Sequence, residues 1–335
     1  MPNARFPKVE ILEMRDDFIK FILSETDTSS ANALRRILQA EIPTLAIDLV
    51  TIESNSSVLQ DEFLAHRLGL VPLRFNGDVA SSFRHNLECD CDDYCQNCAV
   101  EFSLDVRFDE KAAQRPEHER DLPLTVTTLD LHSSNPEVQP VHFGSAEEQQ
   151  NSQDQGICIL KLAKGQEIRL RAIAKMGIGK EHAKWVPVAV ATYQFEPSIK
   201  LNQAALDQLG EDRREALAES CPTTVFEQDP DSGRLVIRDK MDCMYCYECT
   251  ELSDTYKGRP EDDPLIEIRP VEDRFWFSVE TNGAVGAAEC VLSALSVWGT
   301  KLKELQLACM EVKEEHQAGK QAAASSTAIA DASRI

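Results

Sequence analysis

The sequence predicts an α+β fold in which an inserted, mainly β domain interrupts a first domain built from both ends of the chain. An amphipathic helix is predicted near each end of the chain, and each one comes directly after β-prone segments. A sheet with two helices is therefore expected for the first domain. The middle of the chain holds short β-prone runs and a tight group of cysteines. The predicted first domain is 1–45 with 185–318, and the inserted domain is 46–184.

The first 45 residues predict two strands and a helix. In 7–24, apolar residues alternate with polar ones and then form a β-prone run, which is typical of two short strands joined by a polar turn. Hydroxyl groups at 28–30 predict the N-cap of a helix that Pro43 ends. The apolar face of this helix follows three- and four-residue spacing and consists of Leu34, Ile37 and Leu38.

The predicted inserted domain has one helix among several strands. Residues 46–54 predict a strand, and 61–70 predict a second amphipathic helix that Gly69 and Pro72 end. Further strands are predicted from β-prone, apolar segments, of which the first two are expected to pair; they are 99–108, 122–131, 157–162 and 167–174.

The remainder of the first domain predicts strands at 188–195, 265–268 and 274–280. Residues 200–262, which interrupt these strands, are expected to form an irregular insertion with several cysteines. Residues 319–335 are small and polar, so a disordered tail is expected there.

A long helix is predicted over 284–317. Its apolar residues recur every three or four positions for almost four heptads, as in helices that pair along a seam. These residues are Val285, Ala288, Leu292, Leu295, Trp298, Leu302, Leu305, Cys309 and Val312.

Composition and charge narrow the class of protein. The chain has 335 residues, enough for two domains, and 35 basic against 57 acidic residues give a net charge of −22. Binding to a nucleic-acid backbone needs a positive footprint, so direct, specific nucleic-acid binding is not expected. The N-terminal segment lacks the apolar run of a signal peptide, and no stretch of 18 apolar residues predicts a membrane span.

Four cysteines within ten residues predict a metal site. Cys89, Cys91, Cys95 and Cys98 follow the pattern C-x-C-x3-C-x2-C. Four thiolates in a short loop can close a tetrahedral Zn²⁺ site, which would be structural because no coordination position stays open. Two disulfides are the alternative, although they do not fit a reducing compartment, and the spacing also permits iron.

A second cysteine group lies in the irregular insertion. Cys243, Cys246 and Cys249 form C-x2-C-x2-C, and Cys221 before a proline offers a fourth ligand. Paired C-x2-C steps suit an iron–sulfur cluster, while a second zinc site and a set of free thiols are the alternatives.

Two compact basic pairs lie on predicted helices without catalytic neighbours. They are Arg35-Arg36 and His66-Arg67. Arginine is enriched at protein interfaces because its planar guanidinium binds carboxylates through two hydrogen bonds. We interpret both pairs as docking surfaces, with a solvated helix face as the alternative.

Three segments resemble a known family. Residues 31–38 (ANALRRIL) look like the signature helix of the alpha-like subunits of cellular RNA polymerases. Residues 61–73 (DEFLAHRLGLVPL) are similar to the form found in the archaeal alpha-like subunits and their eukaryotic relatives, and 179–185 (GKEHAKW) matches a further family segment. The similarity extends from about residue 7 to about residue 318.

The resemblance implies a non-catalytic assembly subunit of a nuclear DNA-directed RNA polymerase, whose active site lies in other subunits. It implies a dimerisation domain like that of the bacterial alpha subunit, pairing with a small alpha-like partner, the eleventh subunit. It also implies docking of the second-largest subunit and of the tenth and twelfth small subunits. Arg35 and Arg36 match the arginine pair with which the family docks a large subunit.

The cysteine groups refine the resemblance. The loop at 89–98 resembles the zinc loop of the third-largest subunit of eukaryotic RNA polymerase II, which the equivalent subunit of polymerases I and III generally lacks. One structural Zn²⁺ on that loop is therefore implied. The group formed by Cys221, Cys243, Cys246 and Cys249 resembles the iron–sulfur cysteines of the archaeal alpha-like subunits, which many eukaryotic third subunits have lost.

Two other functions compete with an RNA polymerase II subunit. The first is the alpha-like subunit of RNA polymerases I and III, against which the loop at 89–98 argues. The second is an iron–sulfur redox protein that uses the group at 243–249 for electron transfer.

Overall fold

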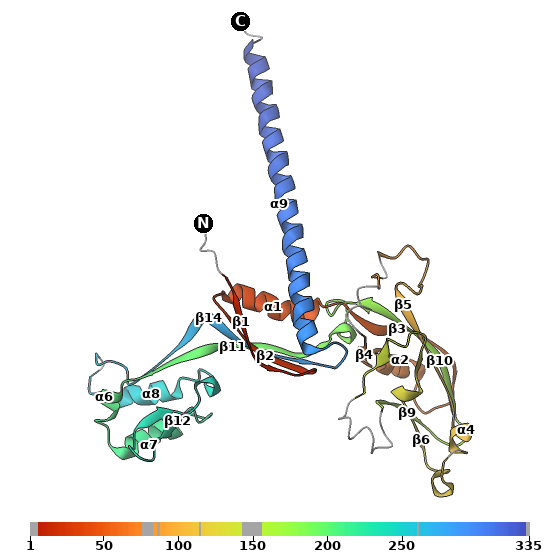
Figure 1. Ribbon diagram of the computed structural model, residues 1–335, viewed down its shortest axis with the longest axis horizontal. Coiled ribbons are helices and arrows are strands. Elements are labelled where there is room, and N and C mark those ends of the chain that lie inside the picture. Colours follow the sequence, from red (N-terminus) through yellow and green to blue (C-terminus); the bar gives the residue numbers. More distant parts are fainter. Residues whose placement is uncertain are drawn as a thin grey trace. The chain divides into compact units, whose positions relative to one another are not determined.

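The structure is a computed structural model that describes residues 6–75, 83–85, 88–113, 115–142, 156–259 and 261–332. It has the predicted α+β fold (Figure 1). The chain divides into two compact units, each made of separate segments. The first unit comprises 1–13, 19–33 and 192–278, and the second comprises 14–18, 34–191 and 279–335.

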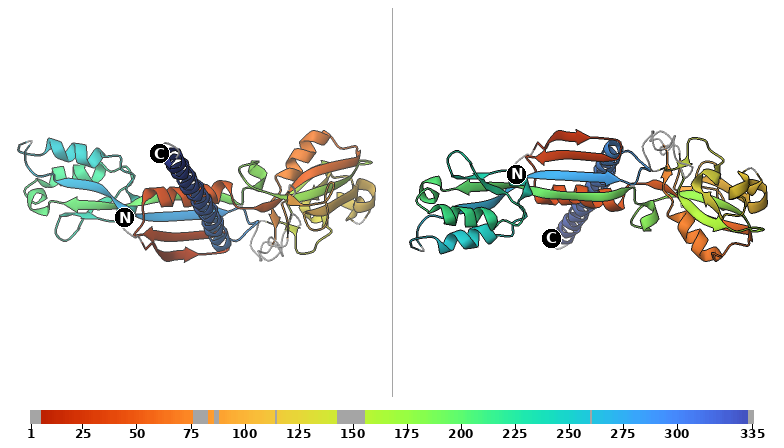
Figure 2. Two further views of the ribbon diagram at one scale, coloured as in Figure 1. Left: turned by 90° about the horizontal axis from the view of Figure 1, so that it is seen from above. Right: turned by 90° about the horizontal axis from the view of Figure 1, so that it is seen from below.

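The first unit contains most of a four-stranded sheet with the order β1-β2-β14-β11. Figure 2 shows these strands side by side. Their bounds are β1 Lys8–Met14, β2 Phe18–Ser24, β14 Ile266–Thr281 and β11 Val188–Leu201. Phe21 of β2 stacks on Phe277 of β14 with ring centroids 5.0 Å apart. The segments 265–268 and 274–280, predicted as separate strands, are one continuous strand.

The insertion predicted to be irregular, 200–262, contains regular elements, so that prediction is wrong. They are α6 Gln203–Leu206, α7 Glu211–Glu219, β12 Phe226–Gln228, β13 Leu235–Ile237, the 3-10 turn η5 Lys240–Asp242 and α8 Glu248–Thr255. The elements are short, and α7 buries only Leu217, so no apolar periodicity marks them in the sequence. They share a small core with Cys221 and Cys249.

The second unit is built on another four-stranded sheet, with the order β3-β10-β5-β7. These strands are β3 Thr44–Asn55, β10 Glu167–Gly177, β5 Ala99–Arg107 and β7 His132–Ser133. Helix α2, Asp61–Gly69, packs against β3 and buries Leu64 and Leu68 completely. One face of β10 is fully apolar and buried, with Ile168, Leu170, Ala172 and Ala174.

Smaller elements complete the second unit. Two short pairs are β4 Leu73–Arg74 with β8 Gln139–Pro140, and β6 Leu124–Thr127 with β9 Cys158–Leu162. Turns and short helices connect them: α4 Phe108–Ala112, η2 Glu117–Glu119, η3 Thr128–Asp130 and η4 Ala183–Trp185. The predicted pairing of 99–108 with 122–131 is wrong, because β5 pairs with β10 and β7. Apolar alternation marks a strand but does not select its partner.

The N-terminal helix α1, Thr28–Ala40, buries the predicted face. Leu34, Ile37 and Leu38 are between 0 and 5% exposed. The N-cap differs from the prediction, since Oδ1 of Asp27 accepts a hydrogen bond at 2.8 Å from the N–H of Ser30. An aspartate carboxylate is as good a cap as a hydroxyl, and it lies one residue before the hydroxyl run.

The C-terminal helix α9 runs from Ala287 to Ala332 and is longer than predicted. The disordered tail expected from residue 319 is therefore not present up to 332, and 333–335 lie outside the described residues. Alanine dominates 322–332 and is the strongest helix former, which accounts for the continuation. Lys301 of α9 binds both carboxylate oxygens of Glu41, at 2.8 and 2.6 Å.

Candidate metal site and interfaces

The four-cysteine loop ends where strand β5 begins. The backbone N–H groups of Cys98 and Ala99 both donate to the carbonyl of Cys95, at 3.1 and 2.9 Å. This tight turn directs Cys95 and Cys98 toward one another, and the N–H of Cys95 also points at Sγ of Cys98, at 3.2 Å. Cys98 and Ala99 pack on Ile173 of the neighbouring strand β10, with the other three cysteines against this cluster.

The four sulfur atoms have the geometry of a tetrahedral site. Their Sγ atoms all lie within 4.8 Å of one another. Sγ of Cys89 is 3.7 Å from that of Cys95, Cys91 is 3.6 Å from Cys98, and Cys95 is 3.8 Å from Cys98. A tetrahedron with zinc–sulfur bonds of about 2.3 Å has edges of about 3.8 Å. The donor set therefore fits one tetrahedral metal ion.

Two of the four thiols, Cys91 and Cys98, have a raised pKa, which favours their protonated form. The pKa of Cys91 is raised to about 12, chiefly by its hydrogen bond with Cys89 and next by burial. Burial likewise raises the pKa of Cys98, whereas a hydrogen bond from the backbone of Asn97 lowers the pKa of Cys95. A divalent cation reverses this balance, because a coordinated thiol is deprotonated outright.

The second cysteine group does not form a comparable set. Among the residues that the structure describes, only the group at 89–98 brings three or more metal-ligating atoms that close together. Cys221 and Cys249 are buried in the small core of the first unit, Cys243 is half-buried, and Cys246 is exposed. Burial is the main cause that raises the pKa of Cys243 and of Cys249, the latter to about 11.

The segment 179–185, which carries part of the family resemblance, is an internal brace. Nζ of Lys184 lies 2.5 Å from Oδ1 of Asp48 and 4.3 Å from the centre of the Trp185 ring. The indole N–H of Trp185 donates to the carbonyl of Lys175 at 3.0 Å, and its own carbonyl accepts from Oγ1 of Thr44 at 2.5 Å. These contacts fasten η4 to β3 and β10.

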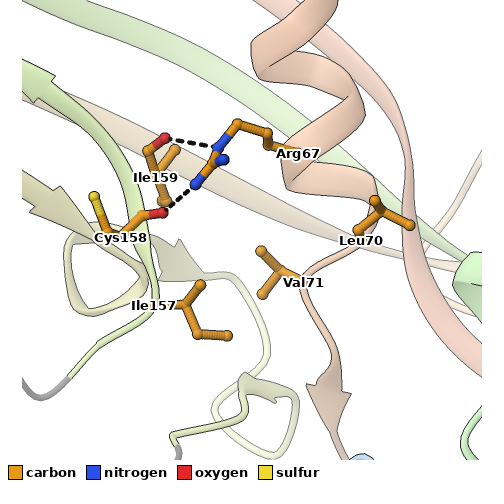
Figure 3. Close-up of a pocket in the computed structure, with 6 residues that line it drawn as sticks. All are labelled: Arg67, Leu70, Val71, Ile157, Cys158 and Ile159. Atoms are coloured by element: carbon orange, nitrogen blue, oxygen red, sulfur yellow. Dashed lines mark hydrogen bonds between the residues drawn. The ribbon is translucent and has the colours of Figure 1, made fainter. Parts of the chain in front are cut away.

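The two basic pairs are used differently. Arg36 is exposed, while Arg35 is half-buried and donates to Oε1 of Gln39 at 2.9 Å. Arg67 is exposed, but it forms two hydrogen bonds within the second unit. Its Nε donates to the carbonyl of Ile159 at 3.1 Å and its Nη2 to that of Cys158 at 2.7 Å (Figure 3). Arg67 thus ties α2 to β9.

An open cavity of about 210 Å³ lies beside this arginine (Figure 3). Its lining is mainly apolar and consists of Arg67, Leu70, Val71, Ile157, Cys158 and Ile159. The sequence did not indicate this cavity, because its walls come from segments almost ninety residues apart.

The apolar seam of α9 is exposed along most of its predicted length. The first turns are buried through Ala287, Cys290 and Ala294, which lie on a different side of the helix from Leu295 and Leu302. The exposed large apolar side chains are Leu292 (67%), Leu295 (42%), Leu302 (52%), Leu305 (62%), Leu307 (61%), Met310 (50%) and Val312 (64%). An exposed apolar area of this extent is typical of a protein interface.

Comparison with known proteins identifies relatives along almost the whole chain. Residues 50–189 match the RNA polymerase Rpb3/RpoA insert domain. The chain is 45% identical over 305 residues to the DNA-directed RNA polymerase II subunit rpb3 of Dictyostelium discoideum, which covers 90% of this chain and 95% of that protein. It is 44% identical over 317 residues to subunit 3 of the DNA-directed RNA polymerases II, IV and V of Arabidopsis thaliana, with 94% and 95% covered.

Two subunits of one organism allow the two polymerase classes to be compared by their identity to this chain. The rpac1 subunit of RNA polymerases I and III of Dictyostelium discoideum is 31% identical over 291 residues, covering 87% of this chain and 78% of that protein. The RNA polymerase II subunit of the same organism is 45% identical. The comparison favours the RNA polymerase II class over the I and III class, and these relatives do not favour the redox alternative.

Proposed function

The chain belongs to the Rpb3 family of DNA-directed RNA polymerase subunits, and we propose that it is the platform on which RNA polymerase II assembles for mRNA transcription in the nucleus. Its role is structural, and the active site of the polymerase lies in other subunits. No helix within the described ranges is long and apolar enough to cross a membrane.

The observation that carries this proposal is the exposed seam of α9. A row of leucines that are 42 to 67% exposed from 292 to 305 leaves a large apolar area in water unless a partner covers it. The partner that fits is the small alpha-like subunit, the eleventh, whose equivalent helix would pack along the seam. The terminal regions 1–45 and 185–318 would form the dimerisation platform.

The other surfaces would receive further subunits. Arg36 is exposed on α1 and, with Arg35, offers guanidinium groups to carboxylates of the second-largest subunit. The inserted region 46–184 would present its outer surface to the tenth and twelfth small subunits.

The four-cysteine loop would hold one structural Zn²⁺. Cys89, Cys91, Cys95 and Cys98 would all be ligands, and the sulfur separations of 3.6 to 3.8 Å support this assignment. The ion would fix the loop against β5 and β10, because it links the start of the loop to its end. For the second cysteine group, the scattered burial of its four thiols favours free thiols over a bound cluster.

The seam is tested by charge substitution. The full chain, co-expressed with the small alpha-like subunit, is expected to form a 1:1 complex in size-exclusion chromatography with light scattering. Leu295→Asp with Leu302→Asp should abolish that complex, because two carboxylates would be buried without partners. A stable 1:1 complex of this double variant would remove α9 from the interface.

The matched control uses the same helix and the same spacing. Ser293→Asp with Thr300→Asp adds two carboxylates, each two residues before a seam position and therefore about 200° around the helix. This variant should pair as the unmodified chain does. Loss of pairing in both variants would indicate a damaged helix and not a specific seam.

A further inference from the structure

One face of the sheet in the first unit carries a small open cavity. Phe21 of β2 and Phe277 of β14 stack on the other face of that sheet. Because side chains alternate along a strand, their neighbours Lys20 and Trp276 lie on the face with the cavity. The cavity has a volume of about 170 Å³ and is lined from three adjacent strands by Lys20, Thr192, Tyr193, Gln194, Trp276 and Ser278. The right-hand view of Figure 2 shows these three strands side by side.

The lining of this cavity provides hydrogen-bond donors and no acidic side chain. Nζ of Lys20 lies 5.7 Å from the centre of the Trp276 ring, and it forms no ion pair with a carboxylate of the described residues. The hydroxyl groups of Thr192 and Ser278 form no hydrogen bond with another residue in the described part of the chain. One ammonium and two hydroxyl groups are therefore available to an acceptor from another molecule.

The surroundings of Trp276 add positive charge to the same face. Its indole N–H donates to the carboxylate of Glu196, which fixes the orientation of the ring. Glu196 also forms ion pairs with Lys240 and Arg274, so two cations share one carboxylate and Lys20 adds a third cation. The chain as a whole carries a net charge of −22, so this local excess of positive charge favours an acidic partner.

We propose that this cavity is a docking site for an acidic segment of a partner protein. One aspartate or glutamate carboxylate of that segment accepts hydrogen bonds from Lys20, Thr192 and Ser278, and its methylene groups pack on the ring of Trp276. A phosphate group is less well matched, because the lining residues include no arginine. The inference goes beyond the proposed function, since the seam of α9, the arginine pair and the inserted region include none of these residues.

The test measures binding of a fluorescein-labelled oligoglutamate peptide by fluorescence anisotropy. The protein is the full chain in complex with its small alpha-like partner, at low salt because screening weakens contacts between exposed charges. The unmodified complex should bind the peptide with a Kd below about 1 mM. Lys20→Met removes the ammonium and should raise this Kd about 5- to 10-fold, the loss expected for a charge-assisted hydrogen bond at a partly exposed site.

Three further variants separate the cavity from the general charge of the chain. Lys20→Arg keeps the positive charge and should stay within about threefold of the unmodified complex. Lys200→Met removes an equal charge from β11 outside the cavity, where the lysine side chain is 72% exposed, and should leave the Kd unchanged. Thr192→Asp places a carboxylate at the exposed edge of the cavity and should raise the Kd at least as much as Lys20→Met. It serves as the second test should Lys20→Met not fold.

Each outcome decides for or against the docking site. An unmodified complex that does not bind the peptide, or one whose Kd is the same in Lys20→Met and Thr192→Asp, would refute it. A short single-stranded DNA with the same label is the phosphate-bearing probe and should bind more weakly than the peptide. Tighter binding of the DNA that is lost in Lys20→Met would overturn the assignment to a carboxylate.

Discussion

Oε1 of Glu196 lies 2.6 Å from Nζ of Lys240, and this ion pair joins strand β11 to the turn that precedes the second cysteine group. The carboxylate is 8% exposed and has two more partners on β14, Nε of Arg274 at 3.0 Å and the indole N–H of Trp276 at 3.2 Å. One buried carboxylate therefore connects three segments of the first unit. The strength of these contacts depends on the ionisation of Glu196, so the stability of the first unit depends on pH.

Glu196→Gln should lower the free energy of unfolding at pH 7 by about 2–4 kcal/mol, since it removes charge-assisted hydrogen bonds and leaves two cations near a neutral amide. Burial raises the pKa of Glu196, but the hydrogen bonds from Lys240 and Trp276 and the nearby positive charges outweigh it, so the pKa is below its ordinary value of 4.5. The stabilisation is thus present above about pH 4.5 and lost as the pH falls through the lower, folded-state value.

Denaturant unfolding at several pH values checks this prediction. The difference between the unmodified chain and Glu196→Gln should shrink steadily on acidification below about pH 4.5. Glu227→Gln, on the exposed edge of β12, is the control and should change stability by less than about 0.5 kcal/mol. A difference for Glu196→Gln that stays constant with pH would mean that the charge of Glu196 contributes nothing.

Cys98→Ser should abolish metal binding at the four-cysteine loop. Cys98 is fully buried immediately before β5. A serine hydroxyl is a weaker zinc ligand than a thiolate, so this substitution removes one of the four ligands. Metal analysis of the purified complex should fall from one zinc to none, and a chelator should no longer lower its melting temperature. Cys158→Ser, outside the loop, should retain one zinc; zinc retained in Cys98→Ser would instead exclude Cys98 as a ligand.

Arg67→Met should destabilise the second unit by about 1–3 kcal/mol. The variant keeps an unbranched apolar stem but loses the two hydrogen bonds that Arg67 donates to the carbonyls of Cys158 and Ile159. Thermal unfolding measures the loss of stability. His66→Ala, at the exposed neighbouring position, is the control and should leave the melting temperature unchanged. If Arg67 served docking alone, the variant would unfold like the unmodified chain and lose only its binding to other subunits.

Gly177→Ala should destabilise the chain by about 1–3 kcal/mol. A Cβ at this position would lie 2.5 Å from Cε2 of Trp185. The Trp185 side chain is buried, and its indole N–H is bonded to β10, so it has little room to move. Gly299→Ala is the contrasting substitution, because nothing lies within 4 Å of its Cβ and alanine favours the helix by about 0.5–1 kcal/mol. The two variants should therefore shift the melting temperature in opposite directions, and a shift of the same sign would contradict the packing argument.

Local pattern predicted much of this structure because the relevant contacts are local. The spacing of Cys89 to Cys98 within one loop limits how far the sulfurs can separate, and they do come together. The periodicity of 284–317 predicted a helix with an exposed seam, and Leu295 and Leu302 are exposed. In both cases each residue that defines the feature lies within a few residues of the next one in the sequence.

Features that depend on distant segments could not be predicted in this way. Strand β5 reads as a strand, yet nothing in its sequence chooses β10, about sixty residues later, over β6. The partners of Glu196 come from 240, 274 and 276. Lys175 looks like a surface lysine in the sequence, yet it is only 7% exposed.

The exposed seam of α9 also bears on the lifetime of the chain in the cell. The helix has 46 residues, about 69 Å in length, and its leucines from 292 to 307 remain in water while the chain is alone. Chaperones and proteases recognise such surfaces, so an orphan copy is expected to be removed faster than a paired one. The abundance of the chain would then follow that of its partner, and the two proteins would accumulate in equal numbers.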